Sequence, residues 1–182
     1  MNRFTSAILA ASLLAGGSAM AMQKNPMVGG AAMYPTKTIV ENAVNSRDHT
    51  TLVAAIKAAD LVPTLSGAGP FTVFAPTNAA FAKLPAGTVD TLVRPENKAT
   101  LTNILTYHVV AGNMGSKQIA AAIKAGGGKA TLTTVQGEPL TAMMRGRNLV
   151  LTDAKGGTST VTIKDVRQSN GVIHVVDTVL MP

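Results

Sequence analysis

The chain has 182 residues, 46% of them hydrophobic, with no cysteine, no tryptophan, two tyrosines and four phenylalanines. This is enough for one domain with its own core, but without disulfides the core must be stabilised by packing alone. Sixteen Lys and Arg against nine Asp and Glu give a net charge of +7, which favours anionic partners. The shortage of aromatic rings excludes a base-stacking surface, so no nucleic acid is expected.

Residues 1–21 have the order of a secretory signal peptide: Arg3, an apolar run from Phe4 to Ala15, and small residues ending at Ala21. The run is shorter than the ~20 residues of a transmembrane helix, so no stable membrane insertion is expected. We expect cleavage near Ala21-Met22 and export to the periplasm or the cell surface. Pro26, the nearby Pro35 and the Gly29-Gly30 pair then predict a flexible leader over residues 22–33, before a single domain at 34–182.

The first part of this domain has mainly helical patterns. Thr38 and Glu41 have capping-box spacing, and Thr50 or Thr51 begins a second helix that Pro63 is expected to end. After a turn at residues 66–70, the β-branched and aromatic residues 71–75 predict a strand. Further helices are expected from Thr77 or Asn78, near residues 88–93, from Pro95 and from Ser116, and an extended segment at residues 107–110.

From Lys129 onward the patterns predict strands separated by turns. Because helical patterns come early and strands late, an α+β fold is expected, with a mainly antiparallel sheet or sandwich against which the N-terminal helices pack. The expected strands are residues 130–135, 140–144, 149–151, 158–166 and 172–180.

Two segments resemble the signature boxes of the fasciclin domain family: residues 69–81 (GPFTVFAPTNAAF) and residues 170–182 (NGVIHVVDTVLMP). Tyr107-His108 is similar to the family's tyrosine-histidine element, and Asp165-Val166 lies where the family often has an Asp-Ile pair. The resemblance covers about residues 34–182. It implies a wedge-like β-sandwich of about seven strands with several N-terminal helices, and a secreted or surface protein that acts in adhesion or extracellular recognition without catalysis.

The resemblance implies a partner-binding role at Tyr107, His108, Asp165 and Val166. For the boxes themselves, buried strand runs and turn residues favour a mainly structural role. We interpret His108 as a hydrogen-bonded core residue with Thr77 as a candidate partner, and His174 alternates with Val175, which allows it to point outward. The structural box residues are Phe71, Thr72, Val73, Phe74, Ala75, Pro76, Thr77, Asn78, Phe81, Asn170, Gly171, Val172, Ile173, His174 and Asp177.

No catalytic or cofactor motif stands out. Cysteine and a Gly-x-Ser-x-Gly elbow are absent, and the three histidines are scattered, which leaves only a hydrolase assembled by the fold as an enzymatic alternative. No His-x-x-x-His or carboxylate cluster has metal-ligand spacing, so no metal site, cofactor or enzyme is expected. Methionines at 22, 27 and 33, with the pair at 143 and 144, leave copper(I) binding by soft thioethers as an alternative.

The expected function is that of an exported, non-catalytic adhesion or surface-recognition module. Its basic surface would engage a cell-surface protein or an acidic polysaccharide. The alternative is a periplasmic carrier that holds a small apolar ligand between helices and sheet, since such clefts are common pocket sites. The partner's identity and the oligomeric state stay open.

Overall fold

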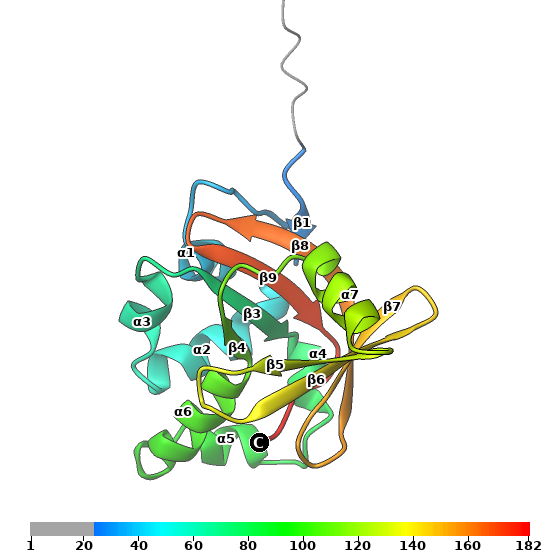
Figure 1. Cartoon of the computed structure of the whole chain (residues 1–182). Coiled ribbons are helices and arrows are strands. Elements are labelled where there is room, and N and C mark those ends of the chain that lie inside the picture. Colours follow the sequence, from blue (N-terminus) through cyan, green and yellow to red (C-terminus); the bar gives the residue numbers. More distant parts are fainter. Residues whose placement is uncertain (1–23) are drawn as a thin grey trace, which may run out of the picture.

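Seven strands form one sheet that curls until its edges meet, in the computed structural model, which describes residues 24–182 (Figure 1). They are β3 (Phe71–Pro76), β4 (Val109–Ala111), β5 (Lys129–Thr133), β6 (Pro139–Arg145), β7 (Asn148–Thr152), β8 (Thr158–Gln168) and β9 (Gly171–Val176). The order is β4-β3-β9-β8-β7-β6-β5. At the edges, Val110 bridges to Thr134, and the Val135 amide donates to the Val109 carbonyl at 2.7 Å. The sheet is therefore almost a closed barrel.

Helices cover this sheet from two sides. They are α1 (Ile39–Ala43), α2 (Thr50–Ala58), α3 (Val62–Ser66), α4 (Asn78–Ala82), α5 (Thr88–Leu92), α6 (Lys98–Tyr107) and α7 (Ser116–Ala125), with single 3-10 turns η1 (Arg47–His49) and η2 (Pro95–Asn97). In Figure 1 α1, α2 and α3 lie to the left and α5 and α6 below, whereas α7 lies on the right and contacts β5 and β6. The expected α+β class with about seven strands and packed helices is confirmed.

The sheet separates two hydrophobic cores. One lies between the helices and the outward residues of β3 and β9, such as Val73 and Ile173. The other fills the barrel and contains Phe74 and Val176, with Ile119 of α7 covering it. Because β9 has a core on each side, all six of its residues are buried, as expected for a strand covered on both faces.

The two signature boxes pair with each other in the middle of the sheet. β3 and β9 run parallel, in register from Phe71 opposite Gly171 to Pro76 opposite Val176. A Cβ at Gly171 would lie 2.0 Å from the Phe71 carbonyl oxygen, and one at Gly69 would lie 2.2 Å from the Asn170 carbonyl oxygen. Glycine at both positions is thus a steric requirement of this close pairing.

Several local predictions are confirmed, and others are wrong. Thr38 and Glu41 form the capping box at the start of α1. Pro63 does not end the second helix, because α2 already stops at Ala58. Pro63 lies in the first turn of α3, where a backbone N–H would have no intrahelical acceptor and proline is therefore tolerated. Residues 107 and 108 are not extended, since α6 continues to Tyr107. The last strand ends at Val176 rather than at 180.

The expected flexible leader is wrong for the residues that the structure describes. Residues 27–28 (β1, Met27–Val28) and 31–32 (β2, Ala31–Ala32) form a small hairpin, and Val28 and Met33 are buried in the helix-side core at 4% and 2% exposure. The core therefore begins before residue 34. The predicted signal peptide, its cleavage point and Met22 lie outside the described residues.

Candidate functional site

Tyr107 and His108, two of the proposed binding residues, are buried at 0% and 2% exposure. The Tyr107 hydroxyl donates to the Pro139 carbonyl at 3.0 Å and accepts from the Ala154 amide at 3.1 Å. His108 Nδ1 donates to the Ile104 carbonyl at 2.8 Å, and Nε2 accepts from the Leu180 amide at 3.0 Å. Burial lowers the pKa of His108 to about 4. The core position predicted for His108 is observed, but its partners are backbone groups rather than Thr77.

Asp165 lies at a bulge of β8 with a left-handed backbone (φ 60°), a conformation that Asp tolerates better than most residues. Its carboxylate accepts from the Ser116 amide at 2.6 Å and from the Ser116 hydroxyl, at the start of α7. Partial burial alone would raise its pKa, but the Ser116 hydrogen bonds and the nearby His174 and Lys164 hold the pKa below its ordinary value. Val166, next in the chain, is fully buried.

His174 does not point outward, as its alternation with Val175 allowed, but is fully buried inside the barrel. Its Nδ1 accepts from the Asp165 amide at 3.3 Å, its Nε2 donates to the Met114 carbonyl at 2.9 Å, and its ring stacks on Phe74 with centroids 5.6 Å apart. Burial lowers its pKa. A neutral His174 thus ties β8 to the loop before α7.

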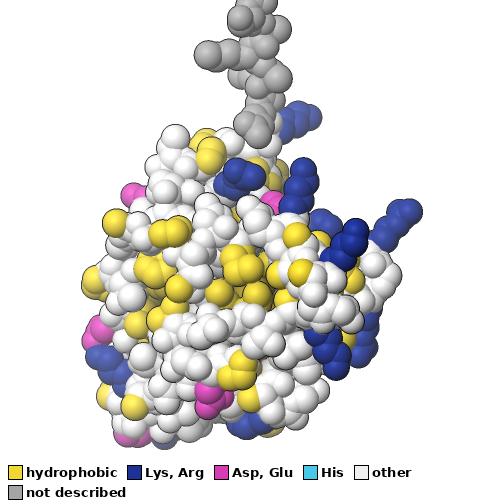
Figure 2. All heavy atoms as spheres, viewed as in Figure 1, with side chains coloured by type: hydrophobic (Ala, Val, Ile, Leu, Met, Phe, Trp, Pro, Cys, Tyr) yellow, Lys and Arg dark blue, Asp and Glu magenta, His cyan; other side chains and the backbone are white. Residues whose placement is uncertain are grey.

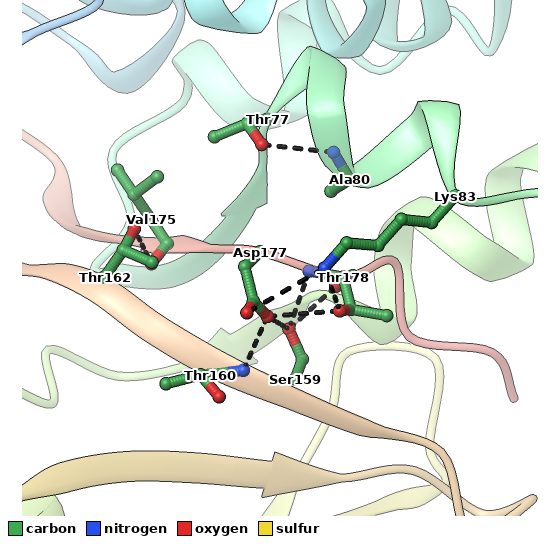
Figure 3. A network of polar contacts seen from close by, with 9 residues as sticks. All are labelled: Thr77, Ala80, Lys83, Ser159, Thr160, Thr162, Val175, Asp177 and Thr178. Atoms are coloured by element: carbon green, nitrogen blue, oxygen red, sulfur yellow. Dashed lines mark hydrogen bonds and ion pairs between the residues drawn. The ribbon is translucent and has the colours of Figure 1, made fainter.

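Asp177 organises the polar network of Figure 3, where the chain leaves β9. Its Oδ1 accepts from the Thr160 amide at 2.8 Å and the Thr178 hydroxyl at 3.1 Å. Ser159 Oγ donates to the Thr178 carbonyl at 2.8 Å, and Lys83 Nζ lies 3.9 Å from Asp177 Oδ2. Asp177 thus fixes the Thr160 amide and the Thr178 hydroxyl at the point where the chain leaves β9.

Two box asparagines hold helices to the sheet. Asn170 Oδ1 accepts from the Ile39 amide at 3.0 Å, and its Nδ2 donates to the Leu65 and Gly67 carbonyls at 2.7 and 2.9 Å. Asn78 accepts from the Thr51 amide at 3.0 Å and so caps α2, while Thr77 caps α4 by accepting from the Ala80 amide at 3.2 Å. These side chains therefore join α1, α2 and α3 to the segments that carry the boxes.

One serine-histidine pair, which the sequence did not reveal, lies beside the hairpin. Ser46 Oγ is 2.8 Å from His49 Nδ1, and both residues are buried. A Cβ on Gly29 would lie 2.3 Å from Ser46 Oγ, so the hairpin backbone covers this hydroxyl. Burial lowers the pKa of His49, and the backbone of Ala75 offsets this lowering only in part. The Nε2 atom of His49 has no hydrogen-bond partner of normal geometry in residues 24–182. Both side chains of the pair are therefore covered by other parts of the described chain.

The cavity between helices and sheet is small. Bounded by the hairpin, α1, α2 and the sheet, it measures about 20 Å³ and is lined mostly by apolar side chains, including Val28, Met33 and Val73. That volume holds about one water molecule, far below the roughly 300–1,000 Å³ of small-molecule pockets.

Two of the methionines named for copper binding, Met27 and Met33, lie in different surroundings, and Met22 lies outside the described residues. Met27 is 59% exposed on the hairpin, whereas Met33 is 2% exposed in the core below it. Within residues 24–182, no group of three or more His, Asp or Glu side chains could hold a metal ion. In the same range no helix is both long and apolar enough to cross a membrane.

Two polar hollows meet at Asp165 and Arg167. One measures about 130 Å³ and is lined by Asn113, Gly115, Gln118, Asp165, Arg167 and Val172. The other measures about 190 Å³ and is lined by Lys24, Asn25, Pro26, Pro35, Asp165 and Arg167. Arg167 is exposed and forms no ion pair within the described residues. Sequence reasoning selected Asp165 but missed Arg167, two residues further along the same strand.

Positive charge concentrates on the part of the chain that carries α7 and the hairpins. Residues 112–168 contain three acidic side chains, of which Asp153 and Asp165 hold backbone amides. In Figure 2 the dark blue side chains gather on the side where α7 and the β6–β7 hairpin lie, and most magenta carboxylates lie on the other side. None of the basic residues of this segment pairs with a described carboxylate. We give the name basic face to the eight Lys and Arg residues of this segment, which lie on α7, on β5, β6 and β8 and in the turns before and after β7: Lys117, Lys124, Lys129, Arg145, Arg147, Lys155, Lys164 and Arg167.

The described chain is thus a nearly closed barrel covered by helices, with its histidines buried and its basic face free of ion pairs to described carboxylates. The profile of the Fasciclin domain family matches residues 47–182, and the chain belongs to this family. It is 47% identical over 160 residues to Protein sll1483 of Synechocystis, covering 88% of this chain and 82% of that protein. It is 36% identical over 182 residues to the cell surface glycolipoprotein MPB83 of Mycobacterium bovis, covering 95% of this chain and 74% of the relative.

The solved structures add a likeness of fold. A FAS1 domain pair from the insect cell adhesion molecule Fasciclin I superposes with a TM-score of 0.71 at 18% identity, covering 80% of this chain and 51% of that one. This chain therefore matches about half the length of the domain pair.

Proposed function

We propose that this protein is an exported, non-catalytic recognition module that adheres to an acidic polymer or an acidic surface protein through its basic face. The observation that carries this proposal is the set of eight Lys and Arg side chains in residues 112–168 that form no ion pair with a described carboxylate. Unpaired charge of one sign on one side attracts partners of the opposite sign.

A non-catalytic role is supported by the contacts of the histidine and aspartate side chains, the residue types that could act as acids or bases. His108 and His174 satisfy backbone groups inside the fold, and Asp165 and Asp177 hold backbone amides. Catalysis needs such groups free to act on a substrate. Recognition needs only exposed groups that a partner can reach, which the basic face provides.

Export to the periplasm or the cell surface is supported by the signal-peptide pattern of residues 1–21. The relative MPB83 is described as a cell surface glycolipoprotein, and the FAS1 pair comes from a cell adhesion molecule. A surface location would place the basic face where anionic polysaccharide or acidic protein is accessible.

The test is binding of the purified protein to immobilised polyuronate, with neutral dextran as reference, over a series of salt concentrations. Affinity should fall steeply as salt rises from about 20 to 300 mM, because screening weakens interactions between exposed charges. Replacing Arg145 and Arg147 by Glu should lower affinity at least tenfold, whereas Lys57→Glu on α2 should change it less than twofold. A flat salt response, or equal losses in both variants, would refute the proposal.

The carrier alternative receives no support from the cavity between helices and sheet, because about 20 Å³ does not accommodate a ligand larger than water. Native mass spectrometry of protein purified from its host distinguishes the two functions. A small mass lost on unfolding would favour the carrier, and a ligand-free protein that binds polyuronate would favour recognition.

A further inference from the structure

The two polar hollows at Arg167 have the sizes of two adjoining subsites. At about 130 and 190 Å³ each is smaller than the roughly 300–1,000 Å³ of pockets that enclose a whole small molecule. Each fits one ring-sized group. Because Asp165 and Arg167 line both hollows, a chain of such groups can occupy both while passing over the same guanidinium.

At the two hollows Arg167 is available to bind a ligand, whereas the Asp165 carboxylate is already hydrogen-bonded. Both Asp165 oxygens accept from Ser116, so this carboxylate forms part of the wall between β8 and α7. Arg167 lies opposite Val172 in the β8–β9 ladder, exposed and without an ion pair to any described residue. A planar guanidinium in this state matches a carboxylate with two parallel hydrogen bonds.

The rest of the smaller hollow offers groups that bind hydroxyls. Asn113 and Gln118 provide side-chain amides that can both donate and accept, and Val172 is its one apolar lining side chain. Hydroxylated rings that carry a carboxylate, repeated along a chain, satisfy this combination. An acidic peptide also offers carboxylates to an unpaired arginine, and at Arg167 β8 pairs with β9 on one side while the β7 pairing is confined to residues 158–160. The two side-chain amides favour the sugar chain, and the glutamate tetramer in the experiment below distinguishes the two ligands.

We propose that the two hollows bind successive residues of an acidic polysaccharide, with Arg167 holding a uronate carboxylate and Asn113 and Gln118 holding ring hydroxyls. This inference rests on the proposed function and assigns its specificity. The basic face supplies long-range attraction to any polyanion, and the hollows select sugars that carry carboxylates.

The experiment titrates a uronic acid tetramer into the full-length mature protein and its Arg167→Lys and Arg167→Gln variants by calorimetry at about 50 mM salt. The matched control is Arg147→Gln, the same loss of charge at an exposed position of the β6–β7 turn. We expect at least tenfold weaker binding for Arg167→Gln, intermediate binding for Arg167→Lys because it keeps charge without the fork, and less than a threefold loss for Arg147→Gln.

A second variant and two further ligands make the outcomes separable. Gln118→Ala should weaken binding of the uronate tetramer about threefold to tenfold, and a neutral hexose tetramer should bind at least tenfold more weakly than the uronate. If the uronate polymer binds with steep salt dependence but Arg167→Gln equals Arg147→Gln, the subsites are refuted while the proposed function stands. If a glutamate tetramer binds as tightly and depends equally on Arg167, the sugar assignment is overturned. If no polyanion binds, the proposed function itself fails.

Discussion

Protonation of His108 should be a large source of acid sensitivity in this fold. The ring is 2% exposed, its Nδ1 donates to Ile104, and its Nε2 already accepts a hydrogen bond from the Leu180 amide. A proton on Nε2 would face that amide, and the charge would be buried without a counterion in direct contact. Burial accordingly lowers the pKa from 6.5 to about 4.

The sign and size of the effect follow from linkage. Since the folded-state pKa lies below the unfolded value, the unfolded state binds more protons between pH 6.5 and 4, and stability falls as pH decreases through this window. Above pH 6.5 His108 contributes no pH dependence. A fall of the pKa from 6.5 to about 4 corresponds to roughly 3 kcal/mol of stability in full, most of it lost by pH 4.5.

The assay is urea unfolding of the wild type and of His108→Gln at pH values from 8 to 4.5. Glutamine offers one donor and one acceptor but does not titrate, so the variant should be less stable at pH 7 and lose less stability on acidification. The wild type should lose roughly 2–3 kcal/mol more than the variant by pH 4.5. His49 and His174, whose pKa values are lowered by burial, titrate in both proteins and cancel. Parallel profiles, or an NMR titration of His108 with a midpoint near 6.5, would refute the reasoning.

Three further predictions concern packing and hydrogen bonds, each measured by urea unfolding at pH 7. Asn170→Ala leaves three backbone partners unpaired and should cost about 3 kcal/mol or more; a loss below 1 would contradict its structural role. Met33→Ala should cost about 2–5 kcal/mol, whereas Met27→Ala, at an exposed position, should cost little. Equal losses of stability in the two variants would favour the interpretation of this segment as a flexible leader. Thr152→Val removes a buried hydroxyl without a hydrogen-bond partner in the described residues and should stabilise by about 1 kcal/mol.

The sequence predicted features that depend on neighbouring residues. The capping box of Thr38 and Glu41 and the cap at Thr77 involve groups three residues apart, and each is observed. The late strands are also found, because turn residues separate runs of β-forming side chains. The segment at Tyr107 looked extended for the same reason, but there the burial of Tyr107 and the His108 contact with Ile104 favour a continued helix.

Features that depend on distant residues were not predictable in this way. Nothing near Met33 indicates that α1, α2 and the sheet form an apolar site beneath it, so its segment resembled a leader. His174 alternates with buried valines and should face water on a sheet with one solvated side. His174 is buried because the barrel closes over that side of the sheet. The closure follows from the order of the strands, which the alternation of residues along one strand does not reveal.

The arrangement of the boxes limits where this protein can recognise a partner. β3 and β9 pair at the centre of the sheet between two cores, so most of their side chains are inaccessible. Tyr107, His108 and Val166 are buried as well, and of the four residues implied by the family resemblance only Asp165 reaches the surface. A partner of the proposed kind would therefore contact the residues around this frame. Asp165 borders both the hollows and the basic face, which makes Arg167 the position where charge attraction and shape selection can act on the same ligand.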